Sequence, residues 1–220
     1  MSFSAQDLEN RDYTVKIGQY FGRGWEIFKQ YALPFIGFML VVGVIGAVAS
    51  KLPYPLGLNE DRQGGIVNAL LSPALGAGFY IVAFKIAKGR TASFSDFFQG
   101  FNRYLPIFLV SLVSSLLIGV GTVFLILPGL YLAVAYLFAL PFVLDKHLDF
   151  WPAMETSRKL ITKQWFGFFG LIILIVLLNI AGALALGIGL FVTAPWSTCT
   201  IAAAYEDIVG LNGSNAGIEG

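Results

Sequence analysis

The sequence is short of the residue types on which most enzymatic and metal chemistry depends. It contains one cysteine, Cys199, and one histidine, His147, and only 12% of its 220 residues are charged. A single cysteine excludes an internal disulfide and any cysteine-based metal cluster. With one histidine, expected at the surface, we expect no serine-histidine-acid triad. Neither a phosphate loop nor a Gly-x-Gly-x-x-Gly fingerprint occurs in a strand-helix context. We therefore expect no enzymatic activity and no cofactor.

What the sequence has in excess is apolar side chain. Apolar residues make up 57% of the chain and aromatic residues 15%. Soluble domains carry about 25% charged residues, so this composition lies outside their range. A bilayer can accommodate that much apolar surface, whereas one soluble core cannot. The net charge of +1 indicates neither a nucleic acid nor an acidic partner. Composition therefore predicts an integral membrane protein.

Six apolar runs are long enough to suggest membrane crossing, which takes about 20 residues of helix. They cover residues 33–51, 66–87, 105–127, 129–144, 166–189 and 191–209. Only Leu127-Pro128-Gly129 separates the third run from the fourth, so these two are expected to form a tight hairpin. The predicted fold is an all-α integral membrane protein with six transmembrane helices, arranged as three parallel hairpin repeats.

The distribution of lysine and arginine predicts the orientation. Cytoplasmic loops are enriched in these residues. The N-terminal segment and the two connections on the same side contain Arg11, Lys16, Arg23, Lys29, Lys85, Lys88, Arg90, Arg103, Lys146, Arg158, Lys159 and Lys163. The opposite side has only Lys51 and Arg62. Both termini are therefore predicted to be cytoplasmic.

Each hairpin is preceded by a segment with an aromatic stripe at helical spacing and basic residues off that stripe. Ser93 and Asp96 give the second of these segments a capping-box signature. Such helices can lie in the headgroup layer and contact anionic lipid, or pack on the bundle as elbows, and both placements give the same stripe. The residues expected at the lipid interface are Trp25, Phe28, Phe97, Phe98, Arg103, Trp151, Arg158, Lys159 and Trp165.

These units divide the chain into one membrane domain and two tails. The domain is expected to cover residues 14–210, with repeats over about 14–87, 93–144 and 149–209. Residues 1–13 are expected to form an N-terminal tail, and residues 211–220 a flexible C-terminal tail. Small residues four apart, such as Ala74 and Gly78, predict close helix packing.

The stretch from Leu127 to Phe169 carries a resemblance to a known group. It reads Pro128-Gly129-Leu130-Tyr131-Leu132-Ala133, then Trp151-Pro152-Ala153-Met154, Ser157-Arg158-Lys159 and Gln164-Trp165-Phe166. This resembles bacterial six-helix inner-membrane proteins: the YciC-like proteins and the membrane domain fused to some glycerophosphodiester phosphodiesterases. The resemblance implies a bacterial inner-membrane location. It implies no particular activity, because the group has none agreed.

Five polar residues at the predicted cytoplasmic ends of the helices form the sharpest candidate site. They are Asp145, His147, Asp149, Glu206 and Asp207. Histidine with carboxylates can hold a divalent metal. The interpretation we favour is structural: Asp145 and Asp149 end one helix and cap the next, so no metal is expected.

Two functions remain open at this stage. The first is a non-enzymatic membrane scaffold or accessory subunit, and the second is a transporter or lipid-handling protein for a small or amphipathic substrate. The expected partners are anionic lipid headgroups and another membrane protein or a second copy of the chain. No nucleic-acid partner is expected.

Overall fold

The chain was analysed as a computed structural model that describes residues 12–49, 51, 60–185 and 187–212. Over these ranges the protein is helical and contains no strand. Most of both predicted tails, residues 1–11 and 213–220, lies outside the described residues. The helices, in chain order, are α2 (Ile17–Gln30), α3 (Ala32–Ala49), α4 (Glu60–Ala87), the 3₁₀ helix η1 (Phe94–Arg103), α5 (Tyr104–Phe124), α6 (Ile126–Ala135), α7 (Ala139–Asp145), α8 (Phe150–Thr162), α9 (Trp165–Leu184) and α10 (Leu190–Val209).

Five helical stretches are long and apolar enough to cross a membrane. They are Ala32–Ala49, Gly65–Ala87, Phe94–Phe124, Ile126–Asp145 and Trp165–Leu184. The predicted sixth span, 191–209, is helical as α10 but is not among them. Its sequence contains Thr193, Ser197, Thr198 and Thr200 and ends with two acidic residues, which lower its hydropathy. The protein is therefore consistent with a multi-pass membrane protein that has five such helices among the described residues.

The fourth predicted span, 129–144, is not one continuous helix. It consists of α6 and α7, which are separated by a turn at residues 136–138. Pro141 has no N–H to donate to the carbonyl of Leu137, so the helical hydrogen-bond ladder is interrupted there. The buried Ser157 of α8 occupies the break: its hydroxyl accepts a hydrogen bond from the N–H of Phe138 at 3.1 Å and donates to the carbonyl of Ala135 at 2.7 Å.

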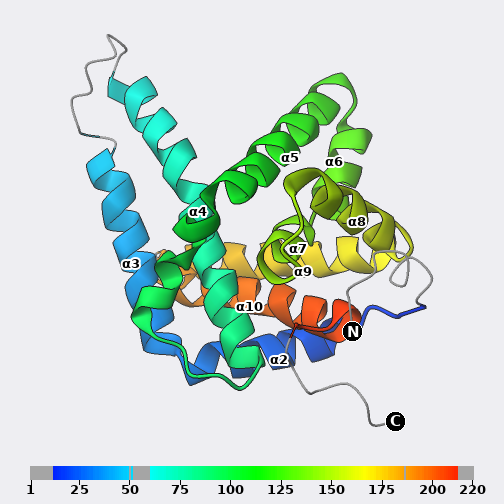
Figure 1. Cartoon of the computed structure of the whole chain (residues 1–220), viewed down its shortest axis with the longest axis horizontal. Helices are drawn as coiled ribbons and strands as arrows, with labels where there is room; N and C mark the ends of the chain where they lie inside the picture. Colours follow the sequence, from blue (N-terminus) through cyan, green and yellow to red (C-terminus); the bar gives the residue numbers. More distant parts are fainter. Residues whose placement is uncertain (1–11, 50, 52–59, 186, 213–220) are drawn as a thin grey trace.

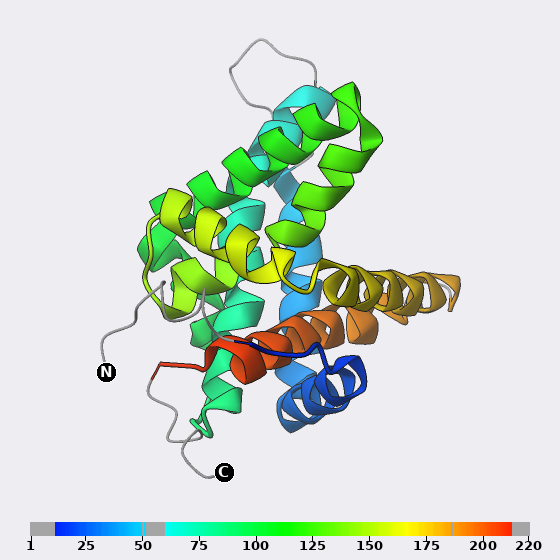
Figure 2. The same ribbon diagram turned by 90° about the vertical axis from the view of Figure 1, so that its right-hand side faces the viewer.

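The long helices form three hairpins that diverge from a common base (Figure 1). The pairs are α3 with α4, α5 with α6, and α9 with α10, and the third pair runs across the first (Figures 1 and 2). The first helix of each pair is the more exposed: the most apolar windows of α3, η1–α5 and α9 are 17%, 11% and 17% buried. The corresponding windows of α4 and α6–α7 are 33% and 44% buried.

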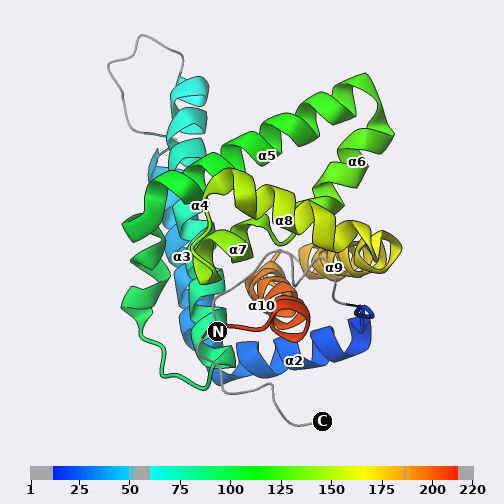
Figure 3. The ribbon, with the colours of Figure 1, turned by 45° about the vertical axis from the view of Figure 1, so that its right-hand side comes forward.

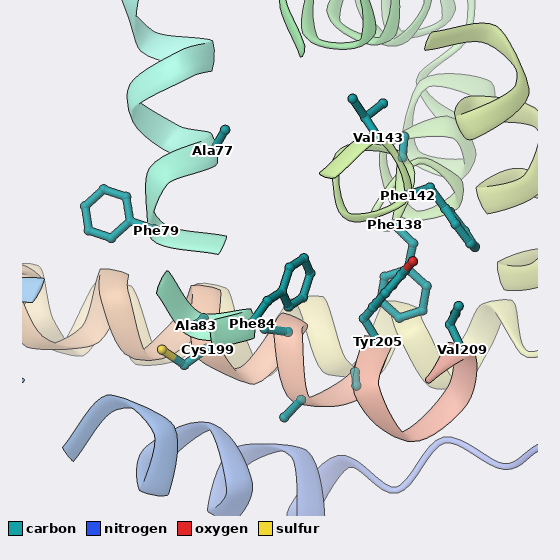
Figure 4. Packing of buried hydrophobic residues seen from close by; sticks show 14 of the residues in the cluster. Ala77, Phe79, Ala83, Phe84, Phe138, Phe142, Val143, Cys199, Tyr205 and Val209 are labelled. Atoms are coloured by element: carbon teal, nitrogen blue, oxygen red, sulfur yellow. The ribbon is translucent and has the colours of Figure 1, made fainter. Parts of the chain in front are cut away.

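Aromatic side chains from three returning helices meet at the base. The ring of Tyr205 on α10 lies 5.5 Å from that of Phe84 on α4 and 5.3 Å from that of Phe142 on α7. Phe138, at the start of α7, contacts the same tyrosine ring at 5.4 Å. All four rings are at most 5% exposed, and Figure 4 shows them converging from their separate helices. This cluster joins the three hairpins.

The segments that precede the hairpins pack on the helices. Helix α2 lies along α10 (Figures 1 and 3), and a Cβ on Gly24 would come within 2.7 Å of the Thr200 backbone. Gly78 of α4 lies against the backbone of Phe97 in η1, and the Ala74 backbone lies against Gly100 of η1. The predicted close packing at Ala74 and Gly78 is therefore confirmed. The capping-box contact is present: the N–H of Ser93 donates to an Asp96 oxygen at 2.7 Å.

Candidate functional site

The five predicted polar residues do not form one site, because their side chains belong to separate networks. Asp145 lies at the end of α7, whereas Glu206 and Asp207 lie near the end of α10. No group of three or more histidine, cysteine or acidic residues that could hold a metal ion occurs in the described part of the chain. The metal hypothesis therefore has no supporting geometry within these residues.

Asp145 is the most buried of the five. Its side chain is 0% exposed and accepts from the ammonium groups of Lys88 at 2.9 Å and Lys146 at 3.0 Å. The N–H of Asn212 also donates to this carboxylate at 3.1 Å, and the Asn212 amide donates to the Asp145 carbonyl at 2.7 Å. One buried carboxylate thus links α4, α7 and the segment after α10. Asp145 ends α7, as predicted, and it also holds three segments together.

The first two residues of the predicted flexible tail are held in place by these contacts. Leu211 is 5% exposed and packs in the core. Asn212 bonds to Asp145, and Lys146 donates to the carbonyl of Gly210 at 2.7 Å. Residues 211 and 212 therefore contact the body of the protein, where the buried carboxylate and lysine need polar partners. The flexibility of the tail stays a prediction.

Glu206 and Asp207 bind α2 and the residue preceding it. Arg23 donates to both Glu206 oxygens at 3.2 Å, a bidentate pair that raises the pKa of the guanidinium. The Tyr20 hydroxyl donates to Asp207 at 3.0 Å, and Lys16 lies 3.6 Å from the same carboxylate. Burial, opposed by a hydrogen bond from the backbone of Lys16 and reinforced by Asp207, raises the pKa of Tyr20 to about 12. These acids fasten α10 to α2.

His147 and Asp149 lie in the connection between α7 and α8. His147 is the one described residue other than glycine with a left-handed backbone, with φ of 57°. Its carbonyl accepts from Arg103 at 3.4 Å. Asp149 occupies the N-cap position of α8, as predicted, and its carbonyl accepts from the N–H of Ala153 at 3.0 Å. Its side chain makes no capping hydrogen bond.

A second ion pair lies beside the Asp145 network. Lys85 of α4 donates to Asp96 of η1 at 2.7 Å, and Gln99 donates to the same oxygen at 2.6 Å. A cavity of about 290 Å³ lies next to it, between the ends of α4 and α7 and Asn212. Its polar lining consists of Lys85, Lys88, Arg90, Asp145, His147 and Asn212. Lys85, Lys88 and Asn212 were not among the five predicted polar residues. The feature of the sequence that points to the lysines is the run of basic residues after the second apolar span.

The residues predicted at the lipid interface divide into exposed and buried groups. Trp151 is 59% exposed, and Trp25 and Phe98 are each 36% exposed. Phe28 and Phe97 instead lie inside the protein, 2% and 0% exposed, which leaves neither ring a lipid contact. The reason is packing: Phe97 stacks on Phe38 at 4.4 Å, and Phe28 lies 5.9 Å from Phe35.

The remaining predicted interface residues are basic or half-buried. Arg158 pairs with Glu155 at 2.7 Å, and this bond lowers the pKa of the glutamate. Lys159 is exposed. Arg103 donates to the carbonyls of Val143 and His147, and Trp165 is half-buried. The polar side of these segments therefore contributes local ion pairs as well as solvent-exposed charge.

No known protein family, curated protein or solved structure matches this chain.

Proposed function

We propose that this chain is a non-enzymatic scaffold or accessory subunit of a membrane complex. The observation that carries the proposal is the exposure of one helix in each hairpin. Val44 on α3 is 62% exposed, Leu116 on α5 62%, and Leu177 on α9 54%. Apolar side chains on such flanks are stable only against lipid or another protein. The α9–α10 pair runs at a steep angle to the other two hairpins (Figure 2).

The proposal includes a six-span topology with both termini cytoplasmic. Five helices are long and apolar enough to cross, and α10 pairs with α9 through a turn at Gly187, whose φ is +76°. Support for three repeats comes from the base, where α4, α7 and α10 each contribute a ring to one cluster. The lysine and arginine asymmetry supports the orientation. The resemblance to YciC-like proteins supports a bacterial inner membrane, and anionic lipid headgroups are the proposed lipid partners.

A photo-crosslinking experiment tests the scaffold role. A photoreactive amino acid is placed singly at Val44, Leu116 and Leu177, and the protein is crosslinked in its native membrane. A scaffold should yield the same stoichiometric protein adduct, or a dimer of this chain, from at least one flank. The matched control is Ile161, which is 0% exposed and should yield no intermolecular adduct.

The alternative is a transporter or lipid-handling protein. The observation that favours it is the basic cavity beside α4 and α7, which has an apolar wall at Phe84 and Leu144. If all three flanks gave lipid adducts and no protein adduct, the scaffold role would be contradicted and lipid handling supported. Mass spectrometry of material purified in mild detergent would then identify an enriched lipid or small molecule.

A further inference from the structure

The cavity between α4, α7 and Asn212 has an excess of positive charge. Lys85, Lys88 and Arg90 line it, whereas Asp145 is the one carboxylate among its lining residues. That carboxylate is already shared between Lys88 and Lys146. The cavity therefore offers more cationic donors than its own acid can neutralise.

The cations differ in how far they are committed to protein partners. Lys88 is paired with the buried Asp145, and its side chain is 14% exposed. Lys85 is paired with Asp96, which keeps two other donors, the N–H of Ser93 and the amide of Gln99. Arg90 is exposed, and among the described residues no carboxylate lies within ion-pair distance of it. An incoming anion can therefore bind Lys85 and Arg90 with the smallest loss of existing ion pairs and hydrogen bonds.

The chemistry of these donors suits a phosphate group. A guanidinium presents a planar fork that matches phosphate oxygens, and an ammonium adds a point charge with three donors. His147 also lines the cavity and has a left-handed backbone conformation, which is uncommon for a non-glycine residue and is concentrated at functional sites. The lining also includes three apolar side chains, Ile81, Phe84 and Leu144. A phosphate attached to an apolar or glycerol group could therefore contact both the basic and the apolar lining residues.

We propose that this cavity binds a phosphate group, held by Arg90 and Lys85 beside Lys88. The phosphate is that of an anionic membrane lipid headgroup or of a free phosphate. The ends of α4 and α7 lie on the predicted cytoplasmic side, where anionic headgroups attract basic residues. This inference goes beyond the scaffold role, and only its lipid source rests on the proposed membrane location.

The competing role for these cations is purely structural. Lysines near a helix C-terminus interact favourably with the helix dipole and would neutralise Asp145 and Asp96. In that case their removal would lower stability without changing which anions bind. The test therefore needs a binding measurement and a charge-matched control.

The experiment compares three full-length proteins in detergent: wild type, Lys85→Gln/Arg90→Gln, and the control Lys29→Gln/Lys163→Gln. The control removes two exposed charges from other segments of the same predicted side. Binding of phosphatidylglycerol and of phosphatidylcholine is titrated by native mass spectrometry. A direct hydrogen bond from a charged donor contributes about tenfold or more in affinity, so loss of both donors should weaken phosphatidylglycerol binding roughly 100-fold. The control should stay within about twofold of wild type.

A second arm identifies the source of the phosphate. The thermal unfolding midpoint is measured with inorganic phosphate and with chloride at equal ionic strength. Stabilisation of wild type and the control by phosphate, lost in the cavity variant, indicates a site for free phosphate. Cavity-dependent phosphatidylglycerol binding without that stabilisation indicates a lipid headgroup. If the cavity variant matches the control in both arms, the proposal is overturned. Neither arm involves a protein partner, so the result is separate from the crosslinking test of the scaffold role.

Discussion

Ser157 shows how one side chain can make a break in a long apolar helical segment tolerable. Within an apolar environment each unpaired backbone group is costly, so a helix break survives only where other groups supply the missing bonds. The Ser157 hydroxyl is fully buried and bonds to both sides of the α6–α7 break, at Phe138 and Ala135. A serine on a neighbouring amphipathic segment gives no sign of this role in the sequence, because its partners lie 19 and 22 residues away.

Replacing Ser157 with alanine should destabilise the protein. The change leaves one N–H and one carbonyl buried without partners, at about 1–3 kcal/mol for each unsatisfied group. The free energy of unfolding, measured by denaturant titration in detergent, should fall by about 2–6 kcal/mol. Ser114→Ala is the control, since the Ser114 hydroxyl is buried without a hydrogen-bond partner in the structure. Equal loss in the two variants would contradict the proposed role of Ser157.

Asp145 is the second residue whose role depends on its surroundings. Breaking a buried ion pair by removing one partner costs about 3–5 kcal/mol, because the other charge stays buried. Asp145→Asn leaves Lys88 and Lys146 without their shared carboxylate. The unfolding free energy should fall by about that amount, and hydrogen exchange at Leu211 and Asn212 should accelerate.

Asp149→Asn is the matched control for this substitution. Asp149 is exposed and its side chain makes no capping bond, and asparagine is as good an N-cap residue as aspartate. Its effect should be about 1 kcal/mol or less. A similar loss of stability at both positions would mean that the buried network contributes nothing specific.

At the scale of elements, the contact between α2 and α10 decides whether the first amphipathic helix packs on protein or lies in lipid. The aromatic stripe before the first hairpin predicts a helix, and helix α2 is found there with Tyr20, Gly24 and Phe28 buried. The same pattern could not distinguish a helix lying in lipid from one packed on protein. The close approach of Gly24 to Thr200 favours packing here.

Gly24→Ala should weaken the α2–α10 contact. The new Cβ would lie 2.6 Å from the Thr200 nitrogen, so one backbone must move, and overpacking of this kind costs about 1–3 kcal/mol. Gly18→Ala in the same helix meets nothing within 4 Å and should instead stabilise by about 0.5–1 kcal/mol. Thermal unfolding of the two variants should therefore shift in opposite directions. Shifts of the same sign would show that the interface is not tightly packed.

For the whole molecule, the question is whether the third hairpin crosses the membrane as the first two are proposed to do. The α9–α10 pair runs across the α3–α4 pair (Figure 1), and α10 is more polar than the five membrane-crossing candidates. Six spans require all three hairpin tips to lie on one side of the membrane. A third hairpin lying along the membrane would place its tip elsewhere.

Cysteine labelling of intact cells measures this directly. In a Cys199→Ala background, single cysteines at Leu125 and Ile188, which are 67% and 69% exposed, mark the tips of the second and third hairpins. A cysteine at Ser95 marks the base. Six spans predict that an impermeant thiol reagent labels Leu125→Cys and Ile188→Cys from outside, and Ser95→Cys only after permeabilisation. Protection of Ile188→Cys alongside labelling of Leu125→Cys would contradict the sixth span.

The sequence by itself determined that the chain is helical and that several of its helices are long and apolar enough to cross a membrane. Apolar run length and helical periodicity are local properties, so they are readable without knowing the fold. They identify the apolar helices, the hairpin pairs and the helical segment before the first hairpin.

Only the tertiary structure decided which partner each polar or aromatic side chain meets. Asp145 binds Asn212, which lies 67 residues away, and Glu206 binds Arg23 at a separation of 183 residues. Long-range contacts of this kind separate the five predicted polar residues into different networks and bury Phe28 and Phe97. The physical reason is that a charge or ring leaves water or lipid only where packing supplies a complementary group, and that packing is set by the whole chain.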